Sequence, residues 1–249
     1  MIIMTRLSIL LFLFCFAVFI SPSQSQDLAA LIKQVEQQYV GESSISTVDM
    51  TVVTGHWERH LSMESWSVGR EHFLIRILEP AKEKGVATLK ADREVWNFLP
   101  KVDRVIRIPP SMMGGSWMGS HITNDDLVKA NHIDEDYDFT LLKEDSEQWV
   151  IQGIPKPDAP VIWGKIIYQV EKKDLIPIQI EYFDEEEILI RRILFDDVQT
   201  IGDRTVPLKM TVLPIEKPDE KTVMHYRNLK FDVDLDLSFF TLAQLKRRR

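Results

Sequence analysis

The chain has 249 residues, with 30 lysines and arginines against 38 aspartates and glutamates. Its formal net charge of −8 at pH 7 argues against general nucleic-acid binding, because that activity draws its affinity from basic patches that face phosphates. The length is enough to bury a sizeable core in one domain, or at most two, and no segment marks a domain boundary.

The N-terminus has the three parts of a secretory signal peptide. Arg6 precedes an uninterrupted apolar run over residues 10–20, and small or polar residues occupy positions 21–26. The apolar run is shorter than the roughly 20 residues that a membrane-spanning helix needs. We therefore predict a signal peptide over residues 1–25. Cleavage after Ser25 is preferred to cleavage after Ser23, and small residues stand at the required sites in both cases.

The single cysteine, Cys15, lies inside the apolar run. A lipidated cysteine would instead follow directly after a Leu/Ala/Gly-type box at the end of that run, so we expect no lipid anchor. Removal of the signal peptide leaves a mature chain without cysteine. This excludes disulfides, a thiol nucleophile and cysteine metal sites from the mature protein.

Residues 27–39 predict one amphipathic helix, with Asp27 as its N-cap and Gly41 just past its end. The apolar residues recur at helical spacing: Leu28, Leu31, Ile32, Val35 and Tyr39. After the helix the period changes to two, which predicts strands joined mostly by hairpin-length links. The predicted strands cover residues 50–54, 61–68, 73–78, 85–90, 94–99, 104–108, 149–153, 163–171, 177–183, 188–195, 206–212 and 222–231.

Three charged segments punctuate the second series of strands, over residues 172–174, 184–187 and 217–220. We interpret all three as solvated hairpin turns, since charged tips also protect sheet edges.

Residues 109–131 do not have the pattern of a strand. Two prolines open the segment, three glycines make its backbone pliable, and Met112, Met113, Trp117 and Met118 supply adaptable apolar surface. Thr123 or Asn124 can cap a short helix that follows. Two interpretations stay open: a loop that covers one end of the core, or a lid whose Met and aromatic residues line a site for an apolar ligand.

This order of elements resembles the outer-membrane lipoprotein-sorting family, the LolA/LolB-like proteins, over nearly all of the mature chain. The resemblance rests on residues 66–76, on the strand pair 95–100 and 105–109, and on residues 115–120 followed by 124–127. It implies a mainly β protein with helices (α+β), in which residues 26–249 form a single LolA-like half-barrel domain. That domain would be a curved antiparallel incomplete β-barrel with an N-terminal amphipathic helix and a short helical lid.

The resemblance also implies a function. A protein of this family is expected to be a soluble periplasmic carrier that binds the acyl chains of lipoproteins or lipids in an apolar cavity and transfers them toward the outer membrane. Two alternatives share the fold: an accessory protein of an inner-membrane RND-type lipid exporter, and a lipoprotein-sensing regulator. Expected partners are lipidated proteins or lipids and an inner-membrane ABC or RND-type exporter, with no nucleic acid, and the protein is expected to be a monomer.

Nine apolar side chains are candidates for contact with cargo, although strand register decides which of them face a cavity. They are Trp66, Phe73, Ile75, Trp96, Phe98, Met112, Met113, Trp117 and Met118. Members of the family have an arginine after the tryptophan-containing second strand whose hydrogen bonds to the lid help to govern opening. Arg70 stands at a similar position, which implies the role of a lid latch. The alternative is an ordinary strand-end arginine paired with Glu71 or another neighbour.

No pattern of catalytic or metal-binding residues is recognisable. His56, Glu58 and His60 lack the spacing of the zinc-protease helix motif, and Phe139 occupies the place of the glycine that a calcium loop starting at residue 134 requires. Residues 134–138 are therefore interpreted as a solvated, charged segment. Residues 114–119 lack the ending of a phosphate-binding loop, and no serine elbow is visible. We therefore expect no enzyme, no metal and no cofactor. The basic residues 246–249 are interpreted as a solvated tail, with contact to anionic lipid headgroups as the alternative.

Overall fold

One 13-stranded antiparallel sheet dominates the computed structural model, which describes residues 23–38, 40–129 and 133–247. The predicted signal peptide falls mostly on residues outside this range. The strands are β1 (Ser43–Val53), β2 (Glu58–Val68), β3 (His72–Glu79), β4 (Ala87–Ala91), β5 (Glu94–Leu99), β6 (Arg104–Arg107), β7 (Tyr137–Glu144), β8 (Gln148–Pro155), β9 (Lys165–Glu171), β10 (Pro177–Phe183), β11 (Leu189–Ile201), β12 (Arg204–Pro214) and β13 (Lys221–Phe231).

The sheet consists of two meanders, the first formed by β1 to β6 and the second by β7 to β13, which meet at a central seam. Its strand order is β6-β5-β4-β3-β2-β1-β13-β12-β11-β10-β9-β8-β7, so the first and last strands of the chain are neighbours. Met50 on β1 pairs with Met224 on β13 at this seam. Strands β6 and β7 stand at the two edges of the described sheet. The prediction of a curved, incomplete antiparallel sheet in a mainly β protein is thereby confirmed.

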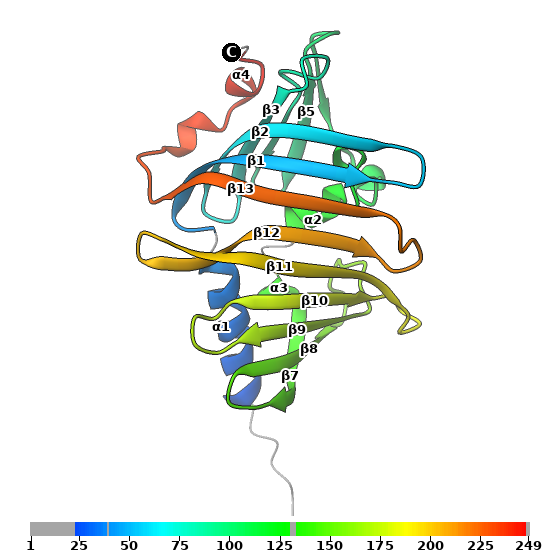
Figure 1. The fold of residues 1–249 in the computed structure, drawn as a ribbon, viewed down its shortest axis with the longest axis vertical. Coiled ribbons are helices and arrows are strands. Elements are labelled where there is room, and N and C mark those ends of the chain that lie inside the picture. Colours follow the sequence, from blue (N-terminus) through cyan, green and yellow to red (C-terminus); the bar gives the residue numbers. More distant parts are fainter. Residues whose placement is uncertain (1–22, 39, 130–132, 248–249) are drawn as a thin grey trace, which may run out of the picture.

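Helices α1 (Ser23–Gln38), α2 (Asn124–Lys129) and α3 (Ile133–Asp136) cover one face of this sheet, which we call the inner face (Figure 1). Figure 1 shows the central strands crossing in front of these helices. In the described residues no helix combines the length and the apolar character that a membrane span requires. Helix α2 begins with a reciprocal cap, because the Thr123 hydroxyl accepts from the Asp126 N–H and the Asp126 carboxylate accepts from the Thr123 N–H.

The prediction missed one strand. Residues 134–138 were expected to form a solvated charged segment, but they belong to α3 and to the start of β7. Tyr137 and Phe139 are 3% and 4% exposed, while Asp138 between them points to solvent. The charges of the segment therefore lie on the solvent side of a strand whose alternate residues enter the core.

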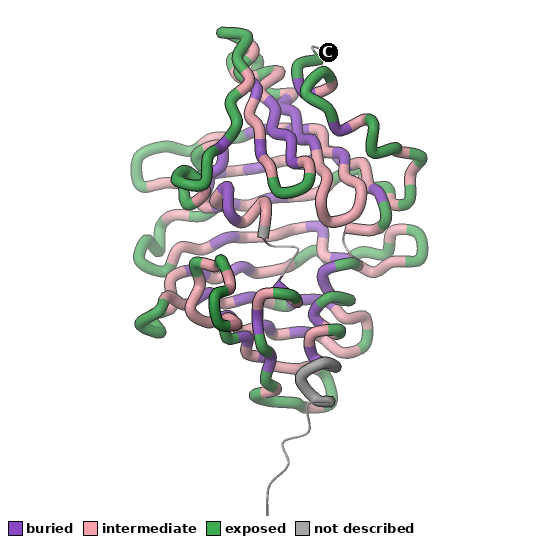
Figure 2. Tube along the Cα trace, turned by 180° about the vertical axis from the view of Figure 1, so that it is seen from behind, coloured by how far each residue is buried: buried purple, intermediate pink, exposed green. Residues whose placement is uncertain are grey.

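Strand alternation divides the buried residues between two hydrophobic clusters. Ile75 and Ile77 of β3 face inward, where the larger cluster also includes Ile32 and Val35 of α1. Leu74 faces the opposite, outer face and belongs to the smaller cluster. Figure 2 shows buried residues along the strands and exposed ones in the turns at both sides of the sheet. Both faces of the sheet thus carry a core.

The C-terminal segment covers the smaller cluster on the outer face. It contains the short 3-10 helix η3 (Leu237–Phe239) and helix α4 (Leu242–Leu245). Leu245 is completely buried, and Phe239 packs against Trp66 with 5.6 Å between the ring centroids. The Arg76 guanidinium donates to the Gln244 carbonyl at 2.6 Å. This segment therefore supplies the apolar cover that β2 to β5 need on their outer side.

Candidate functional site

A cavity of about 240 Å³ lies on the inner face where the two meanders meet. Its floor comes from β1 and β2, where Ser44 pairs in register with Ser67 and Ser46 with Ser65. The Ser44 and Ser67 hydroxyls are hydrogen-bonded to one another at 2.7 Å. Four small side chains at the centre of the sheet leave a space that larger residues would fill.

The walls and roof of the cavity are largely apolar. The side chains come from β3, from the segment before α2, from α2 itself and from β12 and β13: Phe73, Ile75, Trp117, Ile122, Leu127, Met210, Met224, Tyr226 and Leu229. A second pocket of about 80 Å³ shares Met210, Tyr226 and Leu229 with the cavity and adds Phe195 and Pro207. The apolar space therefore continues along β12 and β13.

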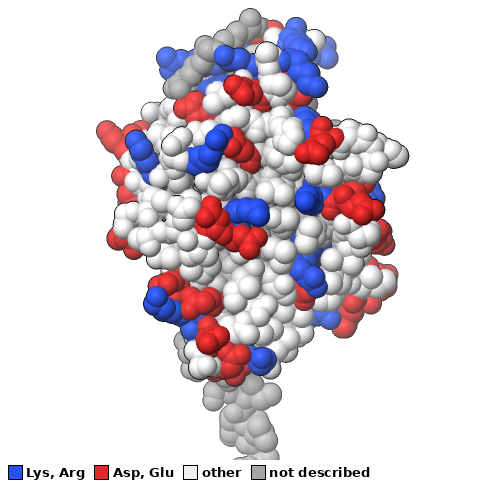
Figure 3. All heavy atoms as spheres, in the orientation of Figure 1, with Lys and Arg blue, Asp and Glu red and all other residues white. Residues whose placement is uncertain are grey.

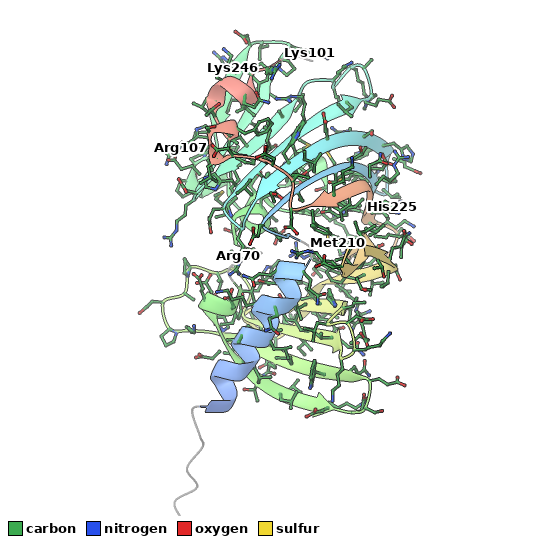
Figure 4. The ribbon with its side chains drawn as sticks, turned by 90° about the vertical axis from the view of Figure 1, so that its left-hand side faces the viewer. Arg70, Lys101, Arg107, Met210, His225 and Lys246 are labelled. Carbon is green, nitrogen blue, oxygen red and sulfur yellow. The ribbon has the colours of Figure 1, made fainter. Side chains whose placement is uncertain are left out.

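The cavity opens beside a polar groove of about 540 Å³. The two share Val40, Gly69 and Arg70, so they are neighbours. Charged side chains of both signs line the groove: Glu42, Arg70, Glu71, Glu135 and Arg204. Figure 4 shows Arg70 and Met210 near the C-terminal end of α1. An apolar interior with a charged mouth suits an amphiphilic molecule.

Residues 109–129 form the roof, and Trp117 anchors it to the first meander. The indole is 1% exposed, and its Nε1 donates to the Thr88 hydroxyl at 3.1 Å. The Arg59 guanidinium donates to the Met118 carbonyl at 2.8 Å. Met118 has a φ of 50° and Gly119 one of 71°, which turns the chain back over the sheet. We call residues 109–129 the roof segment.

A buried ion pair fastens the roof segment to the second meander. The Arg191 guanidinium of β11 donates to both carboxylate oxygens of Asp126, at 2.7 and 2.8 Å. It also stacks over the rings of Tyr182 and Trp163. Burial alone would raise the pKa of Asp126, but the hydrogen bonds and charge of Arg191 hold that pKa below its usual value. The Asp126 carboxylate is thus kept ionised.

Arg70, in the turn between β2 and β3, reaches two helices. Its Nη2 lies 3.1 Å from Glu36 Oε2 on α1 and 2.5 Å from Asp134 Oδ1 on α3. Burial raises the pKa of Glu36 to about 8, although Arg70 and the Tyr168 hydroxyl act in the opposite direction. Lys90, also buried, donates to the carbonyls of Arg70 and Val128. Turn, roof segment and helices thus meet in one polar cluster.

The structure distributes the predicted cargo-contact residues over several places. Phe73, Ile75 and Trp117 line the cavity, and Met118 packs against the inner cluster beside it. Met112 is 55% exposed and Met113 is partly exposed. Three others lie in the outer cluster beneath the C-terminal segment and do not line the cavity: Trp66, Trp96 and Phe98. The reason is that successive side chains of a strand point to opposite faces of the sheet, so the strand register decides which of them face the cavity.

The sequence-based prediction missed the serines of the cavity floor and the lining residues on β12 and β13. The period-two serines at positions 44, 46, 65 and 67 are a usable signal, since small residues on successive inward positions mark an unfilled site. Met210 and Met224 carried no comparable signal. Among the described residues, no group of three or more His, Cys, Asp or Glu side chains is placed to hold a metal ion.

Comparison with solved structures identifies the fold. A DUF1329 family protein from Desulfovibrio piger is 23% identical, with a TM-score of 0.79 over 90% of this chain and 98% of that one. An outer membrane lipoprotein-sorting protein domain from Vibrio parahaemolyticus is 21% identical, with a TM-score of 0.78 over 90% and 99%. A LolA superfamily protein from Nitrosomonas europaea is 24% identical, with a TM-score of 0.71 over 88% and 98%.

A protein-family model described as an uncharacterized protein matches residues 69–247. No curated protein matches the chain. The chain belongs to the family that this model describes, and its fold is that of the LolA-like outer-membrane lipoprotein-sorting proteins, which confirms the family resemblance predicted from the sequence.

Proposed function

We propose that the protein is a carrier that binds the acyl chains of lipoproteins or lipids in the inner-face cavity and passes them on without catalysing a reaction. The observation that carries this proposal is the apolar cavity under the roof segment with a charged groove at its mouth. Burying a methylene group contributes about 0.8 kcal/mol, so an acyl chain gains strongly from such a site. The polar part of the same molecule would stay in the groove.

The size of the cavity implies that loading requires movement. A volume of about 240 Å³ is below the roughly 300–1,000 Å³ of typical small-molecule sites. Two features allow the space to grow: Met210 and Met224 are flexible side chains, and the roof segment is a separate layer over the sheet. We therefore assign this conformation to the closed state of the carrier.

Arg70 is proposed to act as the latch of this closed state. Its contacts with Glu36 and Asp134 join the turn after β2 to α1 and α3, next to the groove. Opening the cavity at this mouth would break at least one of these contacts.

We further propose that the carrier works in the periplasm, after cleavage of its signal peptide near Ser25, as a monomer without a lipid anchor. Its proposed partners are lipidated proteins or lipids, supplied by an inner-membrane ABC or RND-type exporter. Similarity to a lipoprotein-sorting domain and to a LolA superfamily protein supports the assignment to this transport route.

Filling the cavity tests the proposal. Ser65→Leu adds a large side chain to the floor, so we expect the affinity for a fluorescent fatty-acid probe to fall by roughly tenfold or more, because the new side chain occupies the site. Ser62→Leu on the same strand is the matched control, since Ser62 faces outward. Mass spectrometry of lipids extracted from the purified protein would identify the cargo. Absence of probe binding to the unmodified protein, or equal binding by Ser65→Leu, would contradict the proposal.

A further inference from the structure

Three separate segments converge at the end of the sheet formed by β3 to β6. Gly85, in the turn after β3, lies against Pro100 in the turn after β5, where a Cβ on residue 85 would stand 3.5 Å from the proline ring. The Lys246 Nζ, just after α4, lies 3.6 Å from Asp103 Oδ2 in the β5–β6 turn. Figure 4 shows Lys101 and Lys246 at this same end.

This end is strongly basic in a protein that is acidic as a whole. The segments 80–85, 99–104 and 246–247 contain two carboxylates, on Glu83 and Asp103, and six cations: Lys82, Lys84, Lys101, Arg104, Lys246 and Arg247. We call these six residues the basic tip. Five of them lie in turns or after a helix end, and all six are exposed. Figure 3 shows positive side chains gathered at the same end of the molecule.

Exposed apolar side chains stand among these cations. Val102, at the end of the β5–β6 turn, is 61% exposed, and Leu99 is 36% exposed. Cations interspersed with exposed apolar groups are the combination by which peripheral proteins bind the headgroup region of an anionic membrane. Protection of a sheet edge explains Arg104 on the edge strand β6, but it does not explain Lys82, Lys84 or Lys246, which lie outside that strand.

We propose that the basic tip docks the protein on a membrane surface that contains anionic phospholipids. The lysines meet headgroup phosphates, and Val102 enters the interface between headgroups and acyl chains. A lipid surface fits better than a protein partner because the tip consists of projecting turns with solvated cations rather than a recessed apolar groove. The inference stands apart from the acyl-chain cavity, whose described lining includes none of the tip residues.

Vesicle cosedimentation tests this proposal with the mature full-length protein. We expect binding to vesicles that contain phosphatidylglycerol, no binding to vesicles of phosphatidylcholine alone, and loss of binding at about 1 M salt, where the Debye length falls to about 3 Å. The double variant Lys101→Gln/Lys246→Gln should bind roughly 25-fold more weakly, at about fivefold for each cation removed near the surface. Val102→Ser should weaken binding at unchanged charge.

The matched control is Lys173→Gln/Lys217→Gln. These lysines are exposed in turns elsewhere, and each lies 3.6 Å from a carboxylate, as Lys246 does. The control should bind anionic vesicles like the unmodified protein. Equal losses in both double variants, or binding independent of phosphatidylglycerol, would overturn the proposal. Capture of an acidic protein through the tip without any vesicle binding would overturn it as well. Acyl-probe binding should stay unchanged in all these variants, which separates this test from that of the carrier function.

Discussion

Glu36 carries a carboxyl group into the interior of the protein. It is 3% exposed, and its two oxygens accept from the Tyr168 hydroxyl and from Arg70, both at 3.1 Å. Burial raises its pKa from 4.5 to about 8. Between about pH 4.5 and pH 8 the carboxyl group of Glu36 is therefore protonated in the folded state and ionised in the unfolded chain. By linkage, this group contributes stability at low pH that is lost as pH rises through the window.

Glu36→Gln should remove that pH dependence, because glutamine resembles the protonated carboxyl and does not titrate. We expect the free energy of unfolding of the unmodified protein to fall between about pH 4.5 and 8. Chemical denaturation at a series of pH values measures this dependence, and in the variant the free energy of unfolding should fall clearly less steeply with pH. Glu185→Gln, at an exposed turn, is the control and should keep the original slope. An unchanged slope in Glu36→Gln would show that other groups cause the dependence.

Single residues also show where sequence reasoning reached its limit. The alternation of β3 was visible, and Phe73 and Ile75 were rightly placed on one face, but the sequence could not say which face of the neighbouring strands matched it. Trp66 and Phe98 therefore entered the same list although they pack on the outer side. The face on which a side chain lies is set by how its strand pairs with its neighbours, and a shift of one residue exchanges the two faces.

At the scale of elements, two arginines connect the roof segment and the helices to the sheet. Arg191 holds α2 to β11 through Asp126, and Arg70 holds the β2–β3 turn to α1 and α3. The two arginines lie in different meanders, Arg70 in the first and Arg191 in the second. A movement that breaks only the Arg70 contacts would open the polar mouth while α2 stays fixed to the second meander.

Arg70→Leu should therefore accelerate release of a bound acyl probe. The substitution removes the cation from the buried Arg70–Asp134 ion pair, which costs about 3–5 kcal/mol, and part of that loss falls on the closed state. We expect dissociation in stopped-flow measurements to be at least roughly tenfold faster. Arg70→Lys should give an intermediate rate, since the ammonium keeps the positive charge but the shorter side chain lacks the planar guanidinium whose Nη2 contacts both Glu36 and Asp134. Arg93→Leu, at an exposed turn, serves as control. Unchanged uptake and release in Arg70→Leu would remove the latch hypothesis.

Strand β7 shows why an element can be hidden in a sequence. Its inward residues, Tyr137 and Phe139, are separated by Asp138 and preceded by the acidic α3. The charged residues around Tyr137 and Phe139 therefore hid the alternation of inward apolar and outward polar residues. The other twelve strands were recognisable because turns or prolines bounded their apolar runs. The C-terminal cover had a weaker signal, since its apolar residues follow neither a helical nor a strand period over a useful length.

At the scale of the whole molecule, the sheet separates two cores with different roles. The inner core surrounds the cavity, whereas the outer core is filled by Trp66, Phe98 and the C-terminal segment. A void is present on the inner side, and the outer side is packed with side chains from far along the chain. The outer core thus stabilises the wall against which the cavity is built.

Leu245→Ala should separate these roles. Leu245 is completely buried, so its truncation should lower the free energy of unfolding by about 2–5 kcal/mol. Acyl-probe affinity should change little, because the side chain lies on the outer face. Leu242→Ala is the matched control on the same helix, since Leu242 is 45% exposed and its truncation should change stability only slightly. Loss of probe binding in folded Leu245→Ala would show that the two cores are coupled.

The pairing of β1 with β13 has a consequence for how the protein reaches this structure. A chain that emerges N-terminus first completes β1 to β6 long before β13 exists. During that interval β1 presents an open edge with Val48, Met50 and Val52 along it. Such long-range closure is slow, and unpaired edges invite association with other chains. The newly made protein is therefore most vulnerable along the strand that later lies at the centre of its sheet.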